Sequence, residues 1–558
     1  MPGKINKNEP LLLLFSRLFR HVSARRHWQF GLMLGLTLVS SVSEVVSLGA
    51  VLPFIGILTQ PETVMGQPYM AGIIRALGIT SPAELVLPLT AGFAAAALLA
   101  AAFRLALLWG SIRLANATGA DLSLEVYRRT LYQPYRVHVA RNSSEIISGI
   151  TQKVATATGV LISFVAVLTS AILFSSILFT LLVIDPVIAA GAVLIFGAGY
   201  GMVAVLTGSR LASNSCCIAG EQTQVVKALQ EGLGAIRDVL LDGAQAVYCS
   251  VYDRAVRKLQ RANGENSFLS QSPRYAMEAL GMLLVAALAY ILSGRPGGVQ
   301  AAMPLMAAMA LGAQRLLPLL QQLYGNWSVV AGSRASLVDV LALLDQPLPP
   351  DVDLPDPEPM SMRKEIRFEG VGFRYSPDGP WVLRGIDLEI RKGSRVGLVG
   401  TTGSGKSTAI DLLMGLLDPT EGRISVDGRP LDDSGRRAWQ RAIAHVPQSI
   451  FLSDSSIAEN IAFGVPAASI DMRRVKEAAA RAQIADFIES RPGGYGAMVG
   501  ERGVRLSGGQ RQRIGIARAL YKRAQVLIFD EATSALDNAT EKVVMEAIES
   551  LDRELTIV

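Results

Sequence analysis

Charged residues are scarce in this 558-residue sequence, where Asp, Glu, Lys and Arg make up 18% and hydrophobic residues 50%. A soluble globular chain has about a quarter charged residues, so the composition excludes a disordered protein and indicates membrane segments beside a soluble part. The net charge of +6 is modest, and a protein dominated by nucleic-acid binding is excluded as well. The three cysteines, Cys216, Cys217 and Cys249, give no even disulfide framework, which favours a reducing compartment.

The N-terminal residues favour an amphipathic helix over a secretory signal peptide. The apolar run at 11–15 is too short for a signal peptide, and arginines follow it at once. We expect a helix on the inner membrane surface, with Leu14, Leu18 and Val22 on its apolar face.

Six hydrophobic runs are candidates for membrane spans, each of which needs about 20 apolar residues. The predicted spans are 28–58, 84–110, 159–184, 187–207, 276–293 and 301–323, with a tight turn at Asp185-Pro186 between the third and fourth. Lys and Arg concentrate before the first span and in the connections after the second and fourth, which predicts that these segments are cytoplasmic. The chain is therefore expected to be a multi-pass inner membrane protein with both termini in the cytoplasm.

The two basic connections are long, and both have helical patterns. Apolar residues recur at helical spacing in 225–240, and Asn142 followed by Glu145 resembles the start of a helix. We therefore expect the spans to continue as helices into the cytoplasm and to turn back there. Two ordinary cytosolic loops are the alternative, but structureless loops of this length are uncommon.

The composition changes sharply after Leu344, which ends a predicted transmembrane domain at 1–344. Residues 345–362 are rich in proline and acids, so they are predicted to form a linker without helix or central strand. In 363–558, short β-branched runs alternate with helical patterns and Gly-rich turns, a pattern typical of α/β domains.

A phosphate-binding loop follows the run 396–399, which is predicted to be a buried strand. The loop has the pattern G-x-x-x-x-G-K-[ST] between a strand and a helix, so its backbone N–H groups can surround a phosphate chain. Lys406 is expected to reach the β- and γ-phosphates, and Ser407 to offer its hydroxyl to Mg²⁺. A Gly-rich turn with an incidental lysine is the disfavoured alternative. The predicted binding residues here are Gly400, Thr401, Thr402, Gly403, Ser404, Gly405, Lys406, Ser407 and Thr408.

Two acids, Asp530 and Glu531, end the apolar run 526–529. An unbroken apolar run fits a central parallel strand, and ligands bind at the carboxyl ends of such strands. Asp530 is therefore expected to hold the Mg²⁺ shell, and Glu531 to orient or deprotonate the attacking water. Together with the phosphate loop, these acids indicate a P-loop NTPase.

The pentapeptide Leu506-Ser507-Gly508-Gly509-Gln510, followed by Arg511-Gln512-Arg513, resembles the signature of ATP-binding cassette (ABC) proteins. Six predicted spans and one cassette are similar, over essentially the whole chain, to a half-transporter of the exporter class. The resemblance implies an all-α membrane domain of six helices and an α/β P-loop NTPase cassette with a helical subdomain, which binds ATP and Mg²⁺. It also implies that Tyr375 stacks on adenine, that Gln448 is a catalytic residue near Mg²⁺, and that Asp537 belongs to the loop coupling two nucleotide sites.

The resemblance also implies a dimer. Ser507, Gly508 and Gly509 are expected to open a helix and to present N–H groups to an anion. In the family these residues contact the γ-phosphate held by the other subunit, so the simplest assembly is a homodimer.

One departure from the family concerns turnover. The sequence ends at Val558, before the position of the histidine that contacts the γ-phosphate in the family, and His445 lies on a different predicted strand. Either the sequence is truncated, which we favour, or hydrolysis is impaired. For this chain the expectation is ATP binding with weak turnover.

Five ionisable residues in or beside the spans are candidates for a substrate cavity, because a charge at membrane depth costs several kcal/mol unless it is paired or hydrated. Structural ion pairs, Glu44 with Arg104 or Glu278 with Arg315, are the equally weighted alternative. Arginines facing a shared cavity would suit an anionic head group such as a phosphate. The five candidates are Glu44, Arg104, Arg274, Glu278 and Arg315.

A finer resemblance concerns the substrate. Residues 43–55 and 141–145 look like the ABC subgroup that contains lipid-linked oligosaccharide flippases. The expected function is ATP-driven export or flipping of an amphipathic substrate, namely a lipid-linked oligosaccharide, a lipid or a hydrophobic solute. A membrane-anchored ABC ATPase acting as a nucleotide-gated regulator or channel is the alternative, which intramembrane charges and long cytosolic helices disfavour.

Overall fold

The computed structural model describes residues 9–59, 62, 75, 81–184, 186–293, 298–530, 546 and 554–558. The chain divides into two compact units. The first ends at Gln133 and resumes from Arg141 to Pro349, and the second comprises Pro134–Ala140 and Pro350–Val558. The third crossing point, after Pro349, lies inside the predicted linker. The short segment Pro134–Ala140 belongs with the cassette, an association that the sequence did not indicate.

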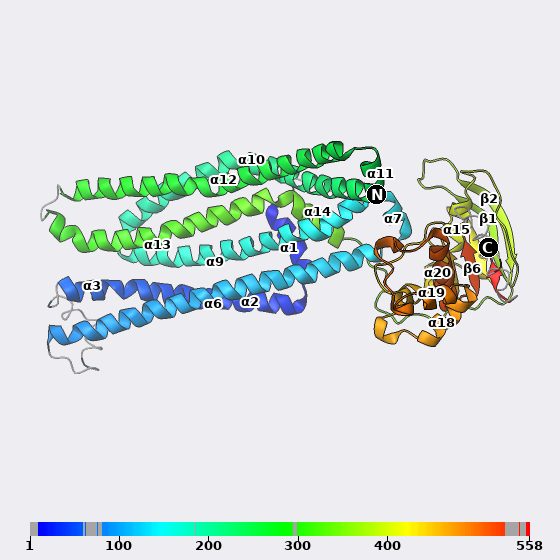
Figure 1. The fold of residues 1–558 in the computed structure, drawn as a ribbon. Coiled ribbons are helices and arrows are strands. Elements are labelled where there is room, and N and C mark those ends of the chain that lie inside the picture. Colours follow the sequence, from blue (N-terminus) through cyan, green and yellow to red (C-terminus); the bar gives the residue numbers. More distant parts are fainter. Residues whose placement is uncertain are drawn as a thin grey trace. The chain divides into compact units, whose positions relative to one another are not determined.

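The first unit consists of long helices that run side by side (Figure 1). Helix α2 packs on α6, α9 on α13, and α10 on α12. The helices of this unit are α1 (Leu11–Arg20), α2 (Ala24–Gly49), α3 (Val51–Thr59), α6 (Pro82–Leu131), α8 (Ser143–Ser148), the π-helix η1 (Gly149–Lys153), α9 (Val154–Ile184), α10 (Pro186–Gly234), α11 (Ile236–Leu241), α12 (Gln245–Ser293), α13 (Gly298–Gly332) and α14 (Arg334–Leu344).

Three of these helices are much longer than a bilayer is thick. Helix α6 has 50 residues, and α10 and α12 have 49 each. At 1.5 Å per residue such a helix extends for about 75 Å, against a hydrocarbon core of about 30 Å. The predicted continuation of the helices beyond the spans is therefore confirmed. Asn142 begins α8 as expected, because its side chain accepts a hydrogen bond from the Ser144 N–H at 3.0 Å.

Within the described ranges, four helices are long and apolar enough to cross a membrane, or five if the bent pair Leu316–Gly332 and Arg334–Leu344 forms one span. The predicted spans 276–293 and 301–323 lie in α12 and α13. The count of six spans stays a prediction. Of the predicted turn between α9 and α10, Asp185 lies outside the described residues.

Helix α1 packs against protein, so the expectation that its apolar face lies on the membrane surface is wrong. Leu14 and Leu18 are completely buried, and they belong to one apolar cluster with Leu337 and Leu341 of α14. The apolar face is where the sequence predicted it. Helix α14 covers this face because it has an apolar face of its own, and both are buried when the two helices meet.

The described residues of the second unit form two sheets. The first is antiparallel with strand order β2-β1-β3-β4, and the second is parallel with order β5-β6-β7. The strands are β1 (Glu365–Phe373), β2 (Leu383–Arg391), β3 (Glu421–Val426), β4 (Arg429–Pro430), β5 (Ile443–Val446), β6 (Val526–Phe529) and β7 (Thr556–Ile557). The main helices are α7 (Tyr135–Ala140), α15 (Lys406–Leu413), α16 (Asp433–Ala442), α17 (Ile457–Ile461), α18 (Met472–Arg481), α19 (Ala485–Ser490) and α20 (Gly508–Tyr521).

The apolar run at 526–529 is a central parallel strand, as predicted. It forms β6 between β5 and β7, and its first three residues are at most 1% exposed. The run at 396–399 differs from the prediction of a buried strand. It is joined to β7 by a hydrogen bond from the Val396 N–H to the Ile557 carbonyl at 2.9 Å, whereas Val399 is 97% exposed.

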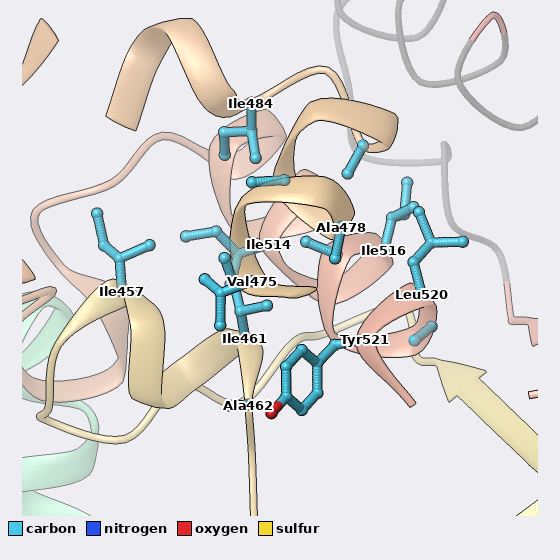
Figure 2. Close-up of a cluster of buried hydrophobic side chains, with 14 of the residues drawn as sticks. Ile457, Ile461, Ala462, Val475, Ala478, Ile484, Ile514, Ile516, Leu520 and Tyr521 are labelled. Atoms are coloured by element: carbon cyan, nitrogen blue, oxygen red, sulfur yellow. The ribbon is translucent and has the colours of Figure 1, made fainter. Parts of the chain in front are cut away.

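A helical subdomain formed by α17 to α20 positions the signature. Isoleucines and other apolar side chains of α17, α18 and α20 interdigitate in one cluster (Figure 2). Ile461, Val475 and Ile514 are completely buried there, and burial of each such side chain stabilises the fold by about 1.5–3 kcal/mol. The cluster therefore fixes α20, whose first turn contains the signature glycines.

Candidate functional site

The phosphate loop wraps around the start of α15 in a conformation that requires glycine. Gly403 has a φ of 81°, and Gly405, the N-cap residue of α15, has a φ of 92°. A Cβ on Gly405 would lie 2.8 Å from Leu383 Cδ2 and 3.1 Å from the Val382 carbonyl oxygen. The loop thus approaches its neighbours more closely than any side chain would permit, and its N–H groups and the helix start can face an anion.

Lys406 reaches back across the loop. Its Nζ donates hydrogen bonds to the carbonyl oxygens of Gly400 at 2.9 Å and Thr401 at 3.2 Å. The ammonium group is therefore held beside the loop backbone, where phosphate oxygens can accept from it. Residues 401–404 and Ser407 are exposed, and Thr408 is buried.

The predicted Mg²⁺ ligands leave neighbouring strands at one edge of the parallel sheet. Val446 of β5 pairs with Phe529 of β6, so Gln448 and Asp530 follow adjacent strand ends. The Asp530 N–H donates to the Val446 carbonyl at 3.1 Å. A carboxylate, a hydroxyl and an amide oxygen are hard ligands that suit Mg²⁺, so this donor set fits the ion. Glu531 and Asp537 lie outside the described residues.

Tyr375 lies next to the phosphate loop. Its hydroxyl is 3.2 Å from Thr408 Oγ1, and its ring packs edge-on against Phe373 with centroids 4.9 Å apart. Half of the side chain remains exposed. These two contacts fix the ring beside the loop, in a position from which it can stack on a base.

The signature opens a helix as predicted. Ser507 is the N-cap residue of α20, and its Oγ accepts from the Gln510 N–H at 3.3 Å, while Gln510 Oε1 accepts from the Ser507 N–H at 2.9 Å. The glutamine of the signature therefore has a structural role, because its side chain caps the start of α20 in this reciprocal capping box. Leu506 and Gly509 are buried, and Gly508 is exposed at the helix start.

A second carboxylate near Asp530 was not identified from the sequence. Burial, together with the charge of Asp530, raises the pKa of Asp411 on α15 to about 6. In the sequence, Asp411 simply follows Ser407 by four residues. Its proximity to Asp530 depends on how α15 packs on the parallel sheet, which the sequence does not indicate. Burial lowers the pKa of His445, on β5, while Asp530 opposes this shift. Among the described residues, His445 Nε2 is buried without a hydrogen-bond partner.

Because folding raises the pKa of Asp411, the folded state favours the protonated carboxyl. We therefore expect the protein to lose stability as the pH rises from about 4 to about 6. Ionisation in the folded state is therefore costly above pH 6, and Asp411→Asn should remove this cost. We expect the nucleotide-free variant to be more stable than the parent at pH 8 by about 1 kcal/mol, a value discounted for partial exposure. The difference should fall to about a third of this value at pH 4.5, where the carboxyl is protonated in the folded state but still mostly ionised in the unfolded state. Thermal unfolding at both pH values measures it, and equal stability at pH 8 would contradict the assignment.

Four of the five charged candidates in the membrane helices form pairs. Glu44 of α2, 1% exposed, pairs with Arg104 of α6, as one of the alternatives predicted. Glu278 pairs with Arg274 at 2.7 Å within α12. The side chain of Arg315 lies outside the described part, so the predicted pair of Glu278 with Arg315 stays a prediction. Glu44 and Arg104 line a common hollow of about 360 Å³. Its other lining residues are Ser47, Ala97, Ala100, Ala101, Leu105 and Leu108.

Comparisons with known proteins agree with this geometry. Residues 383–534 match the family model described as ABC transporter. The ATP-dependent lipid A-core flippase of Chromohalobacter salexigens is 35% identical over 448 residues, which are 77% of this chain and 74% of the relative. The protein of the same name from Alkalilimnicola ehrlichii is 35% identical over 376 residues, 64% of this chain and 61% of the relative.

A solved structure has the same fold. The structure of a bacterial Atm1-family ABC exporter with ATP bound superposes with a TM-score of 0.74 and covers 96% of this chain and 90% of that chain, at 24% identity. The likeness therefore extends over the membrane helices as well as the cassette. This chain belongs to the ABC transporter family, as a half-transporter of the exporter type in which membrane helices and an ATP-hydrolysing cassette are fused and hydrolysis is coupled to transport.

Proposed function

We propose that this protein moves a lipid with an anionic head group across the inner membrane, as a homodimer driven by ATP and Mg²⁺. The observation on which this proposal depends is the Glu44–Arg104 pair, which lies in a hollow between two apolar helices. The relatives named lipid A-core flippases support a lipid substrate. Both termini and the cassette are assigned to the cytoplasm from the distribution of basic residues.

Arg104 is suited to bind a phosphate. Glu44 is almost fully buried, whereas half of the Arg104 side chain is exposed. The guanidinium has five N–H donors in a planar fork, so a head-group phosphate can bind to its exposed side while Glu44 holds the other. The hollow is lined otherwise by alanines and leucines, which suit acyl chains.

A second copy of the chain is supported by an apolar stripe at the cytosolic end of α10 and α11. The stripe was predicted at 225–240, and apart from Val225 its residues are between 43% and 67% exposed. These exposed members are Leu229, Leu233, Ile236 and Leu240, and the neighbouring Leu241 is exposed as well. These segments lie beyond the predicted spans, so lipid does not cover them, and a partner subunit would bury them.

In each nucleotide site we assign Lys406 and the loop N–H groups to the phosphates and Tyr375 to the base. Ser407, Gln448 and Asp530 would hold Mg²⁺, which supplies charge neutralisation on the phosphates. Glu531 accepts the proton of the attacking water. Ser507 and Gly508, at the exposed start of α20, complete the site of the partner, and Asp537 couples the two sites.

Lipid movement in proteoliposomes tests the proposal. We expect ATP-dependent movement of a fluorescent lipid with a phosphate head group, and about tenfold slower movement in Arg104→Gln, because a charge-assisted hydrogen bond contributes about 1.5–3 kcal/mol. The double variant Glu44→Gln/Arg104→Gln tests whether the unpaired Glu44 causes this effect. The control is Arg113→Gln, which removes an exposed arginine of the same helix.

The outcomes separate the two functions. Hydrolysis without lipid movement in the parent protein would favour the regulator or channel. Equal movement in the parent and in both Arg104 variants would exclude Arg104 from the substrate site. Slow movement in Arg104→Gln alone, restored in the double variant, would mean that the pair has a structural role.

A further inference from the structure

Three chain crossings between the two units meet at one polar cluster. The chain passes between the units after Gln133, after Ala140 and after Pro349. On the side of the first unit, Gln133 Nε2 donates to the Pro347 carbonyl at 2.9 Å, and Arg129 donates to the Gln346 carbonyl at 2.7 Å. The Gln346 side-chain oxygen accepts from the Arg141 guanidinium, in the amide orientation that satisfies both groups. We call Arg129, Gln133, Arg141, Gln346 and Pro347 the Gln346 junction.

Gln346 is at the centre of this junction and is 6% exposed. A polar side chain so deeply buried is costly unless its hydrogen bonds are made, so the partners of Gln346 have to stay in place. The junction therefore ties the end of α6, which leads to α7, to the residue that follows α14 by one position.

Helix α1 holds the neighbouring residue. Asp345 accepts from Arg17 and lies 2.8 Å from His21 Nε2. Arg17 also pairs with Glu9 at 2.6 Å. Burial by itself would raise the pKa of Asp345, but the hydrogen bonds from Arg17 and His21 outweigh this effect and hold the pKa below its usual value. The beginning of the linker is thus fixed from two sides, by α1 and by α6.

The far end of the linker is fixed to the second unit. Arg437 of α16 contacts Asp351 at 3.1 Å and Asp356 at 3.0 Å, and Arg441 contacts Asp356 at 2.5 Å. The Met360 N–H donates to the Ala438 carbonyl at 2.9 Å. Only residues 348–350, Leu-Pro-Pro, lie between the two attachments. Proline fixes φ, so this connection is short and stiff.

We propose that the Gln346 junction transmits the motion of the ATP-driven cassette to the membrane helices, and that Gln346 is a positioning residue that makes α6 and α14 move together. The inference rests on the proposed function, because the motion that the junction transmits would act on the proposed path of the lipid. Helix α14 is also bonded to the π-helix η1 through Lys153 and Asp339, at 2.6 Å, so a displacement of α14 reaches α9 as well.

The test is Gln346→Leu, which removes the amide and keeps the volume of the side chain. We expect the amount of lipid moved per ATP hydrolysed to fall about tenfold, a change of the size that coupling between two sites typically produces. The rate of ATP hydrolysis itself should stay within about twofold of the parent value. Gln346→Glu keeps an acceptor for Arg141 and should restore the ratio. Gln260→Leu, at an exposed glutamine of α12, is the matched control.

A second readout does not depend on lipid. Hydrogen–deuterium exchange with and without ATP should show a nucleotide-induced change in α6, α9 and α14 of the parent protein. In Gln346→Leu the change should persist in the cassette and disappear from these helices. If the parent moves no lipid, the proposed function fails, and this exchange experiment still decides on the junction.

Two results would overturn the inference. One is a Gln346→Leu protein that moves as much lipid per ATP as the parent and shows the same exchange response. The other is a variant with a lower melting temperature but an unchanged ratio, which would mean a purely structural role. If Gln346→Leu does not fold, insertion of Gly-Ser between Pro349 and Pro350 tests the stiff connection, and an unchanged ratio there would also overturn the inference.

Discussion

Glu531→Gln is expected to reduce ATP hydrolysis at least about 100-fold while ATP binding stays intact, because general-base catalysis contributes about 10²–10⁴-fold. Glu531 directly follows Asp530, which leaves the buried strand β6 at the edge where β5 also ends, two residues before Gln448. Glutamine has the same size as glutamate but cannot accept the proton of the attacking water. The ATP-bound variant should accumulate as a closed dimer, since the composite site stays occupied.

Phosphate release, equilibrium binding of a fluorescent ATP analogue and size-exclusion chromatography with ATP measure these three effects. Glu489→Gln, at an exposed glutamate of α19, is the matched control and should hydrolyse ATP like the parent protein. Unchanged hydrolysis in Glu531→Gln would remove Glu531 from its catalytic role. A variant that binds ATP and stays monomeric would contradict the homodimer instead, so the two proposals can fail separately.

The sequence indicated the main elements of the fold because they depend on local patterns. Long apolar runs produced α9 and α10, and the four apolar residues before Asp530 produced β6. The glycine spacing of the phosphate loop follows from a backbone conformation that only glycine adopts without strain, which the φ of Gly405 confirms. The capping pattern at Ser507 is likewise local, since its partner is three residues away.

Features that depend on contacts between distant segments could not be predicted. The apolar face of α1 was recognised, but a sequence does not say whether lipid or α14 covers such a face. Val399 fits a buried strand by its residue type, yet it is 97% exposed. Asp411 and Gln346 gain their significance from Asp530 and Arg141, which are far away in the sequence. No periodicity or motif brings such residues together.

Gly405→Ala is expected to weaken ATP binding at least about 100-fold, which corresponds to about 2.7 kcal/mol. Gly405 has a φ of 92°, and a residue with a Cβ pays about 1–3 kcal/mol in such a conformation. The new methyl group would also meet Leu383 Cδ2 at 2.8 Å, at the first residue of β2, and the carbonyl oxygen of the preceding Val382 at 3.1 Å. The loop has to move outward, and its N–H groups then no longer converge on one phosphate.

Gly397→Ala is the matched control, since it adds the same methyl group eight residues earlier. Gly397 has no positive φ, and a Cβ there would have no atom within 4 Å. Its affinity for ATP should therefore stay within about twofold of the parent value, because a methyl group in open space changes the free energy by less than about 0.5 kcal/mol. Equilibrium titration with a fluorescent ATP analogue compares the two variants. If Gly405→Ala binds ATP as tightly as Gly397→Ala does, the strained conformation at Gly405 is not what shapes the phosphate site, and the assignment of this loop to the phosphates loses its physical basis.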